Sequence, residues 1–271
     1  MRASGNAPLI AGAAMVTLLI ATALLSLIWT PYPAEAINIA IRLAPPSPAH
    51  LFGTDAYGRD GLSQAMAGAR TALLVSGAAC LLGIGVGTPL GLLAAARRGW
   101  ADELTMRFSD LVFAFPALLL AVLAAATLGP GALDAVIGIG VYSIPVFAKV
   151  VRTGALRLWS LDYALAARAA GKGGLRISLE HILPNLLAPL AVQGALQLSL
   201  AVVAEAGLAY LGLSAQPPAP SWGRMLADAQ TLYAQAPWLA LFPGAAIVVA
   251  VLGFSLLGEG LRRRFEGEGR A

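Results

Sequence analysis

Residues 159–185 read WSLDYALAARAAGKGGLRISLEHILPN and separate two long apolar stretches of the chain. The segment differs from its neighbours in carrying charged residues, a histidine and three glycines, namely Asp162, Arg168, Lys172, Arg176, Glu180, His181, Gly171, Gly173 and Gly174. We expect two short helices joined by a glycine turn at the cytoplasmic face of a membrane protein. Ser160 is the expected N-cap of the first helix, Asp162 favours its first turn, and Gly171 is expected to end it with a positive φ.

The first half of this segment is rich in alanine, so another backbone can approach it closely. The residues concerned are Ala164, Ala166, Ala167, Ala169 and Ala170. We therefore expect a docking helix. The alternative is an ordinary pair of surface helices between two spans.

The pattern Ala166-Ala167-x-x-x-Gly171, followed after nine residues by His181-Ile182-Leu183-Pro184, resembles the "EAA" loop of permease subunits in bacterial ABC importers. In that family the loop inserts into a cleft on the ATP-hydrolysing subunit and carries its motion to the membrane helices. The resemblance implies an ATPase-coupling loop formed by Asp162, Tyr163, Ala166, Ala167, Arg168, Gly171, His181, Leu183 and Pro184. Leu165 stands where the motif has its glutamate, so a polar contact made by that glutamate is absent or replaced here.

Composition indicates an integral membrane protein, because 58% of the residues are hydrophobic and only 12% are charged. Soluble domains carry about 25% charged residues. The net charge of +4 does not indicate nucleic-acid binding, because the basic residues cluster between apolar spans. The single cysteine, Cys80, excludes a disulfide within the chain and a cysteine-based metal site, and we expect it in the core.

Six apolar runs are long enough to cross a bilayer as helices, at about residues 9–29, 71–96, 110–128, 133–151, 182–204 and 238–258. Residues 34–36 resemble a signal-peptidase site, but the preceding apolar run is too long for a signal peptide, so we expect an uncleaved first span. The expected organisation is an N-terminal span with an external loop and short helix over 1–70, a permease core over 71–262 and a cytoplasmic tail over 263–271.

The basic residues predict the orientation. With both termini in the cytoplasm, the cytoplasmic segments hold 14 of the 18 lysines and arginines, and the external segments hold 4. Positive residues favour the cytoplasmic side. We therefore expect a multi-pass protein of the bacterial inner membrane, with residues 159–185 inside.

The external loop contains the run Gly53-Thr54-Asp55-Ala56-Tyr57-Gly58-Arg59-Asp60. It resembles the G-T-D-x-x-G-R-D signature of the peptide and nickel branch of the same permeases. We expect Asp55, Arg59 and Asp60 to form a charged cluster that fixes the turn into a short helix over 61–69. The alternative is a loop ion pair with no role in transport.

Further motifs of that branch follow in order. They are D-x-x-x-x-F-P from Asp110 to Pro116, E-A-x-L-x-[FY]-L-G-L from Glu205, and P-P-x-P-S-W-G ending in Pro220, Ser221, Trp222 and Gly223. We expect Trp222 to be exposed, either contacting a substrate-binding protein or anchoring the chain at the membrane interface. Asp110 is expected to meet water or Arg107, and Lys149 to reach the head groups.

Two patterns inside the spans concern architecture. Small residues recur every four positions at Ala79, Gly83, Gly87, Gly91 and Ala95, which favours close helix packing in lipid. Spans two to six each hold a proline that is expected to kink or loosen its helix, at Pro89, Pro116, Pro145, Pro189 and Pro243.

No catalytic pattern is present in the sequence, and there is no P-loop of the form G-x-x-x-x-G-K-[ST]. His50 and His181 are expected on opposite sides of the membrane, His50 as a solvated loop residue and His181 in a structural hydrogen bond. We expect no enzyme activity, no metal and no cofactor on this chain, with ATP and magnesium bound by partner subunits.

Together the motifs predict an all-α, six-span permease subunit with the fold of type I ABC importers and a two-helix coupling loop. The resemblance implies a homologous second permease, two ATP-binding subunits and a periplasmic or lipoprotein substrate-binding protein. We expect di- or oligopeptides as substrate; the alternatives are nickel or another small solute. A self-contained secondary transporter or channel is disfavoured, because the spans carry almost no charge.

Overall fold

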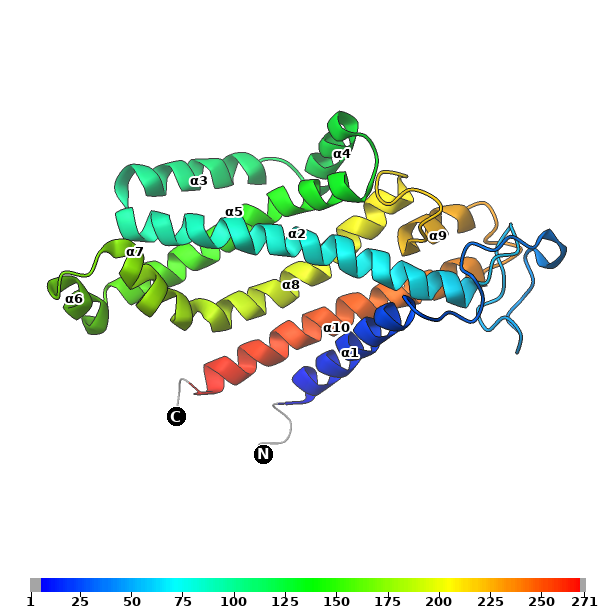
Figure 1. The fold of residues 1–271 in the computed structure, drawn as a ribbon, viewed down its shortest axis with the longest axis horizontal. Helices are drawn as coiled ribbons and strands as arrows, with labels where there is room; N and C mark the ends of the chain where they lie inside the picture. The colour runs from blue at the N-terminus through cyan, green and yellow to red at the C-terminus, as the bar shows by residue number, and fades with distance from the viewer. Residues whose placement is uncertain (1–5, 269–271) are drawn as a thin grey trace.

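The computed structural model describes residues 6–268 as a set of long helices aligned along one axis (Figure 1). The elements in chain order are α1 (Ala7–Leu25), a 3₁₀ turn (Ile39–Ile41), α2 (Gly61–Arg97), α3 (Gly99–Phe113), α4 (Ala117–Leu128), α5 (Ala132–Trp159), α6 (Asp162–Ala169), α7 (Gly174–Ile177), a π-helical turn (Ser178–Ile182), α8 (Leu183–Tyr210), α9 (Trp222–Ala229) and α10 (Trp238–Glu268). Within the described residues, five helices are long and apolar enough to cross a membrane, and the count reaches six if the bent pair α3 and α4 forms one span.

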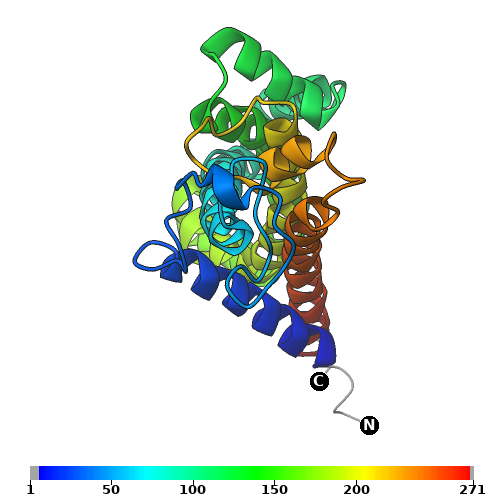
Figure 2. The same ribbon diagram turned by 90° about the vertical axis from the view of Figure 1, so that its right-hand side faces the viewer.

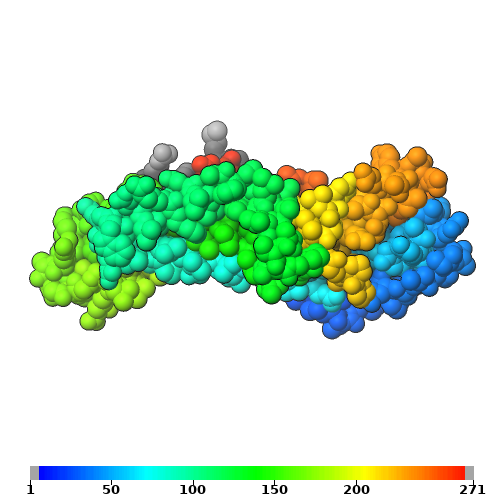
Figure 3. Space-filling view, turned by 90° about the horizontal axis from the view of Figure 1, so that it is seen from above, coloured from blue at the N-terminus to red at the C-terminus, as the bar shows by residue number. Residues whose placement is uncertain are grey.

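The two sequence motifs lie at opposite ends of the molecule. In Figure 1, α6 and α7 are at one end of the long axis, and α9 and the loop that precedes α2 are at the other. Viewed end-on in Figure 2, α1 lies on one side of α2, and α3 and α4 lie on the opposite side. The space-filling view shows α3 and α4 covering the middle of one face (Figure 3).

Helix α2 packs tightly on α5 through the predicted stripe of small residues. A Cβ atom added to Gly83 would lie 2.5 Å from Ser143 Cβ, and one added to Gly87 would lie 2.4 Å from the Ile144 carbonyl oxygen. The same is true of Gly91, whose added Cβ would lie 2.6 Å from the Ala148 oxygen. The predicted role of this stripe in close packing is therefore confirmed.

The short helix predicted over 61–69 is not a separate element. It forms the start of α2, which continues without interruption to Arg97. Ala69 and Ala72 are both 1% exposed. Because nothing between them favours a turn, the helix that Asp60 caps runs directly into the span.

The third span differs most from its prediction. In place of one helix over 110–128, α3 ends at Phe113, α4 begins at Ala117, and the two are bent by 86°. Pro116 lies at the break; it has no N–H, and it disfavours a helical conformation for the residue before it. The other four prolines lie inside α2, α5, α8 and α10, which continue past them.

Ion pairs fasten α3 to α5. Lys149 Nζ lies 3.0 Å from Asp110 Oδ1, and Arg152 donates two hydrogen bonds to Asp102, one of them 2.6 Å long. Arg107 pairs with Glu103 instead, at 2.6 Å. Asp110 is 73% exposed, as expected of a residue that meets water, but its ion-pair partner is Lys149, 39 positions away in the sequence, and not Arg107.

The later helices extend beyond the predicted spans. Helix α5 continues to Trp159, α8 to Tyr210 and α10 to Glu268. Most of the expected tail over 263–271 is thus helical, and its last residues, 269–271, lie outside the described part of the chain. Hydropathy identifies the part of such a helix that crosses the lipid. It does not show how far the helix continues beyond the lipid.

Candidate functional site

Helix α6, the first helix between α5 and α8, is capped one residue later than predicted. Leu161, with an extended backbone (φ −85°, ψ 151°), is the N-cap of α6. The Ser160 hydroxyl donates to the Arg157 carbonyl at 2.7 Å, and its backbone stays near-helical at the end of α5. Ser160 therefore closes the preceding helix instead of capping the next one, while Asp162 occupies the first turn of α6 as expected.

Gly171 ends α6 in the predicted way. Its φ is +81°, its N–H donates to the Arg168 oxygen at 3.0 Å, and the Lys172 N–H donates to the Ala167 oxygen at 3.1 Å. These two bonds form a Schellman motif, which needs a residue that tolerates a left-handed backbone. The prediction for Gly171 is confirmed.

One face of α6 is anchored, and the rest of the helix is exposed. Ala164 is fully buried in the same cluster as Ala155, Ile177 and Ile182. Leu161 and Leu165, one helical turn apart, are 45% and 51% exposed. Helix α6 thus presents an exposed apolar stripe, in which Leu165 takes the place of the glutamate of the EAA motif.

A polar cluster braces the glycine turn against the start of α8. Lys172 Nζ lies 2.7 Å from Glu180 Oε2 and 3.0 Å from His181 Nε2, and Arg176 Nε donates to Glu180 Oε1 at 2.6 Å. The ring of His181 also lies 6.4 Å from that of Tyr163, centre to centre. The expected structural hydrogen bond of His181 is present. Sequence reasoning missed the Glu180 brace, although the four-residue spacing of Arg176 and Glu180 could have suggested it.

The remaining motif residues begin α8. Leu183 is half-buried and packs against the core cluster that contains Ala164. Pro184 is in the first turn of α8, where its missing N–H would have no partner in the helix. Ala166 and Arg168 are exposed, and Ala167 is half-buried.

At the other end of the molecule, Asp55 and Arg59 of the predicted charged cluster pair with each other, whereas Asp60 binds His50 and Ser63 instead. Asp55 Oδ1 accepts the N–H groups of Tyr57 and Arg59, both at 2.9 Å, and Asp55 Oδ2 accepts Arg59 Nε at 2.6 Å. Asp60 caps α2 by accepting the Ser63 N–H at 2.8 Å. The turn into α2 is fixed as expected, but by two separate sets of contacts instead of one cluster.

The other residues of this loop are also explained by its folding. Gly53 and Gly58 have φ values of +69° and +73°. Thr54 is fully buried; its hydroxyl accepts the Ala44 N–H at 2.9 Å and donates to the Ile41 oxygen. His50 is not the predicted solvated residue, because its side chain is 15% exposed and its Nδ1 lies 2.9 Å from Asp60 Oδ1.

Trp222 is not exposed, which overturns the expectation made from the Pro220–Gly223 run. It is 2% exposed, and its indole N–H donates to the Ala65 oxygen at 2.9 Å. Ser221 is buried and caps α9, and an added Cβ on Gly223 would lie 2.0 Å from the Ala206 oxygen. The run locks α9 against α2 and α8, and only Pro220 is partly accessible.

Comparison with known proteins gives the family. Residues 87–267, which contain the whole of segment 159–185, match the family described as "Binding-protein-dependent transport system inner membrane component". The chain belongs to this family. It is therefore a multi-pass permease of the inner membrane and a component of an ABC importer, a class that works with ATPase and substrate-binding proteins.

Individual relatives agree with this assignment. The permease is 40% identical over 253 residues to the dipeptide transport system permease protein DppC of Alkalihalophilus pseudofirmus, covering 93% of this chain and 83% of the relative. It is 41% identical over 254 residues to the glutathione transport system permease protein GsiD of Pectobacterium atrosepticum, covering 93% and 84%. To the di/tripeptide permease DppC of Pseudomonas aeruginosa it is 42% identical over 212 residues, covering 78% and 70%.

A solved structure supports the fold. The MetNI methionine ABC transporter in an inward-facing conformation contains a chain that matches with a TM-score of 0.55 at 18% identity, covering 75% of the permease and 92% of that chain. The permease thus has the fold of type I ABC importers, as the motifs predicted.

Proposed function

We propose that this permease forms half of the translocation path for di- or oligopeptides and is driven by a separate ATPase that grips segment 159–185. The observation that carries the coupling role is α6 itself, a short helix at the extreme end of the molecule whose leucine stripe faces outward while Ala164 fixes it to the core. Leu165 would make an apolar contact in place of the motif's glutamate. The relatives named for dipeptides, di/tripeptides and glutathione support a peptide substrate over nickel.

The proposed complex contains this permease, a homologous second permease, two ATP-binding subunits and a periplasmic or lipoprotein substrate-binding protein. ATP and magnesium would bind to the ATPase subunits, and this chain would hold no cofactor and hydrolyse nothing. Both termini would lie in the cytoplasm.

The path would run along the face of α4, α5 and α8. A hollow of about 390 Å³ lies there, and Tyr142 and Gln197 are among its lining residues. Gln197 is held by a hydrogen bond of 2.8 Å to the Ser143 hydroxyl. A largely apolar wall with few polar groups suits a passage shared with a second permease, because it binds the solute weakly enough for release.

The binding protein would dock on exposed residues beside the buried Trp222. Tyr57 is 51% exposed and lines a hollow of about 210 Å³ together with Pro218 and Arg224. This surface replaces Trp222 as the proposed contact.

Replacing Gly171 tests the coupling role. Valine at this position should uncouple ATP hydrolysis from transport, because a β-branched residue is strained at φ +81° while no other atom lies within 4 Å of the added Cβ. Peptide uptake by the reconstituted complex should fall at least tenfold, whereas membrane insertion and ATP hydrolysis persist.

Gly173 supplies the matched control. It also has nothing within 4 Å of an added Cβ, but its backbone is extended (φ −69°, ψ 153°), so Gly173→Val should transport normally. Wild-type transport by Gly171→Val would show that the coupling assignment is wrong.

A further inference from the structure

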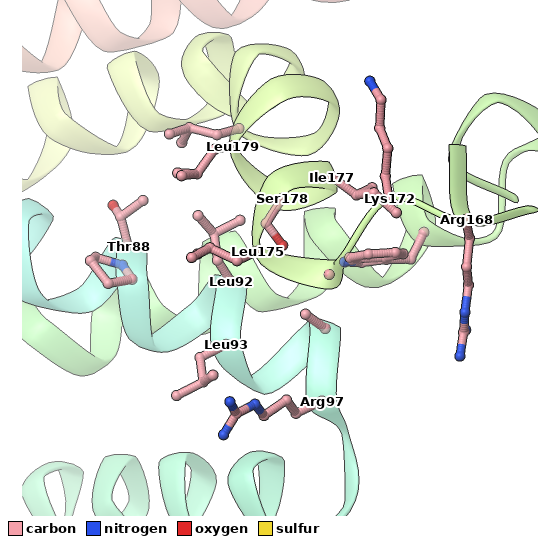
Figure 4. Close-up of a pocket in the computed structure, with 15 residues that line it drawn as sticks. Thr88, Leu92, Leu93, Arg97, Arg168, Lys172, Leu175, Ile177, Ser178 and Leu179 are labelled. Carbon is pink, nitrogen blue, oxygen red and sulfur yellow. The ribbon is translucent and has the colours of Figure 1, made fainter. Parts of the chain in front are cut away.

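A groove of about 700 Å³ separates the end of α2 from the segment that follows α6 (Figure 4). Residues between Thr88 and Arg97 form one wall, and α7 with the π-helical turn forms the other. Five leucines line it, namely Leu92, Leu93, Leu175, Leu179 and Leu183. The buried residues of the segment pack on α5 and α8 and also on Leu92 and Ala95 of α2, so the groove is the part of the α2 side that these contacts leave open.

Three buried polar groups of this groove have no hydrogen-bond partner among residues 6–268. They are the hydroxyls of Thr88 and Ser178 and the indole N–H of Trp159. Thr88 is 8% exposed and Ser178 is 1% exposed, and Ser178 points from the π-helical turn toward α2 (Figure 4). Buried polar groups in folded proteins are normally paired. All three groups can donate a hydrogen bond, and all three are enclosed by the groove wall.

Two arginines of the groove also lack an ion-pair partner in the part of the chain that the structure describes. Within the described chain, neither Arg97 nor Arg168 forms an ion pair, although Lys172, which also lines the groove, is bound to Glu180 at 2.7 Å. In Figure 4 the side chain of Arg97 extends leftward at the lower edge of the view, that of Arg168 points downward at the right, and that of Lys172 points upward. Guanidinium groups suit phosphate oxygens, which they can bind with two parallel hydrogen bonds.

We propose that this groove binds one anionic phospholipid, with its head group at the basic rim to which Arg97 and Arg168 contribute and an acyl chain against the leucines. Thr88 lies nine residues before Arg97, which is about 14 Å along the helix, so the groove can hold the upper part of an acyl chain. Basic pockets at the cytoplasmic ends of spans suit anionic head groups, and the choice of the cytoplasmic leaflet rests on the orientation proposed above.

Native mass spectrometry of the whole complex, delipidated in neutral detergent, tests the site by titration with phosphatidylglycerol or phosphatidylcholine. Each cation near the head group is worth roughly fivefold in affinity, so the double variant Arg97→Gln/Arg168→Gln should bind phosphatidylglycerol about thirtyfold more weakly. Arg107→Gln/Arg263→Gln removes the same charge from arginines that are 76% and 52% exposed outside the groove, and it should bind within twofold of wild type.

A second variant fills the groove and keeps every charge. Leu93 is 40% exposed on the groove wall, so Leu93→Trp should lower phosphatidylglycerol binding at least tenfold without unfolding the complex. Because the readout is lipid binding, it is independent of whether peptide is transported. The proposal is overturned by equal binding of the two lipids, by wild-type binding in either groove variant, by inorganic phosphate competing as well as the lipid, or by side chains of another subunit filling the groove.

Discussion

Asp60 connects the start of α2 to His50 of the external loop through one carboxylate. Its Oδ2 accepts the Ser63 N–H and hydroxyl at 2.8 and 2.7 Å, and its Oδ1 lies 2.9 Å from His50 Nδ1. We expect Asp60→Ala to lower the free energy of unfolding by about 1–2 kcal/mol, because the helix cap is lost and buried donors are left unpaired.

Asp60→Asn is the matched variant, since asparagine caps helices as well as aspartate does. It should lose less than half as much stability. The measurement is the melting temperature of the purified complex. An alanine variant that melts with the wild type would show that the cap does not stabilise this loop.

At the residue scale, local spacing determined which predictions succeeded. Gly171 and the Asp55–Arg59 pair were predictable, because a helix end and a pair four residues apart are set by neighbouring positions. Trp222 was not, because the atom that accepts its N–H lies 157 positions away. The composition of a loop does not show whether the loop is exposed or folds back onto two helices, so the burial of Trp222 could not be predicted from it.

Among the elements, α2 and α5 offer the sharpest test of packing. Gly87 and Gly85 lie on the same helix, but an added Cβ meets the Ile144 oxygen at 2.4 Å from Gly87 and nothing within 4 Å from Gly85. Gly87→Ala should destabilise the complex by about 1–3 kcal/mol, since backbone must move apart. Gly85→Ala should be neutral or stabilising by up to about 1 kcal/mol, because alanine favours a helix.

Thermal melting of both variants checks this prediction, with insertion into the membrane as the control for synthesis. If Gly87→Ala melted at the same temperature as Gly85→Ala, the close contact between α2 and α5 would be wrong. Gly85 and Gly87 lie on different faces of α2. The effect that replacing glycine by alanine has on any helix is therefore present in both variants and cancels when their melting temperatures are compared.

The existence of the spans was predictable, but their continuity was not. Apolar runs predicted six crossings, whereas α3 and α4 cross only as a pair bent by 86°. Pro116 breaks its helix and Pro145 does not, although both stand within apolar runs. Burial does not separate the two cases, because Pro89 and Pro189 are exposed like Pro116 and still lie inside continuous helices. The presence of a proline in an apolar run therefore did not show which helix would break.

At the scale of the whole molecule, the long helices hold the two motif regions far enough apart to reach water on opposite sides of a bilayer. Helix α2 has 37 residues and spans about 55 Å, which exceeds the roughly 30 Å of hydrocarbon in a bilayer. Its start carries the Asp55–Asp60 cluster, and its end carries the groove beside α7. A signal from an ATPase to the external side would therefore have to pass along packed helices such as α2 and α5.

Single-cysteine labelling can show which end of α2 faces the cytoplasm, because Cys80 is the only cysteine of the sequence and is 4% exposed. In a Cys80→Ala background, Tyr57→Cys and Trp100→Cys replace residues that are 51% and 67% exposed at opposite ends of α2. The positive residues favour the Trp100 end inside. A membrane-impermeant maleimide should therefore label Tyr57→Cys on intact cells and Trp100→Cys only on inside-out vesicles. Labelling of Trp100→Cys from outside the cell would reverse the orientation and remove segment 159–185 from the reach of any cytoplasmic ATPase.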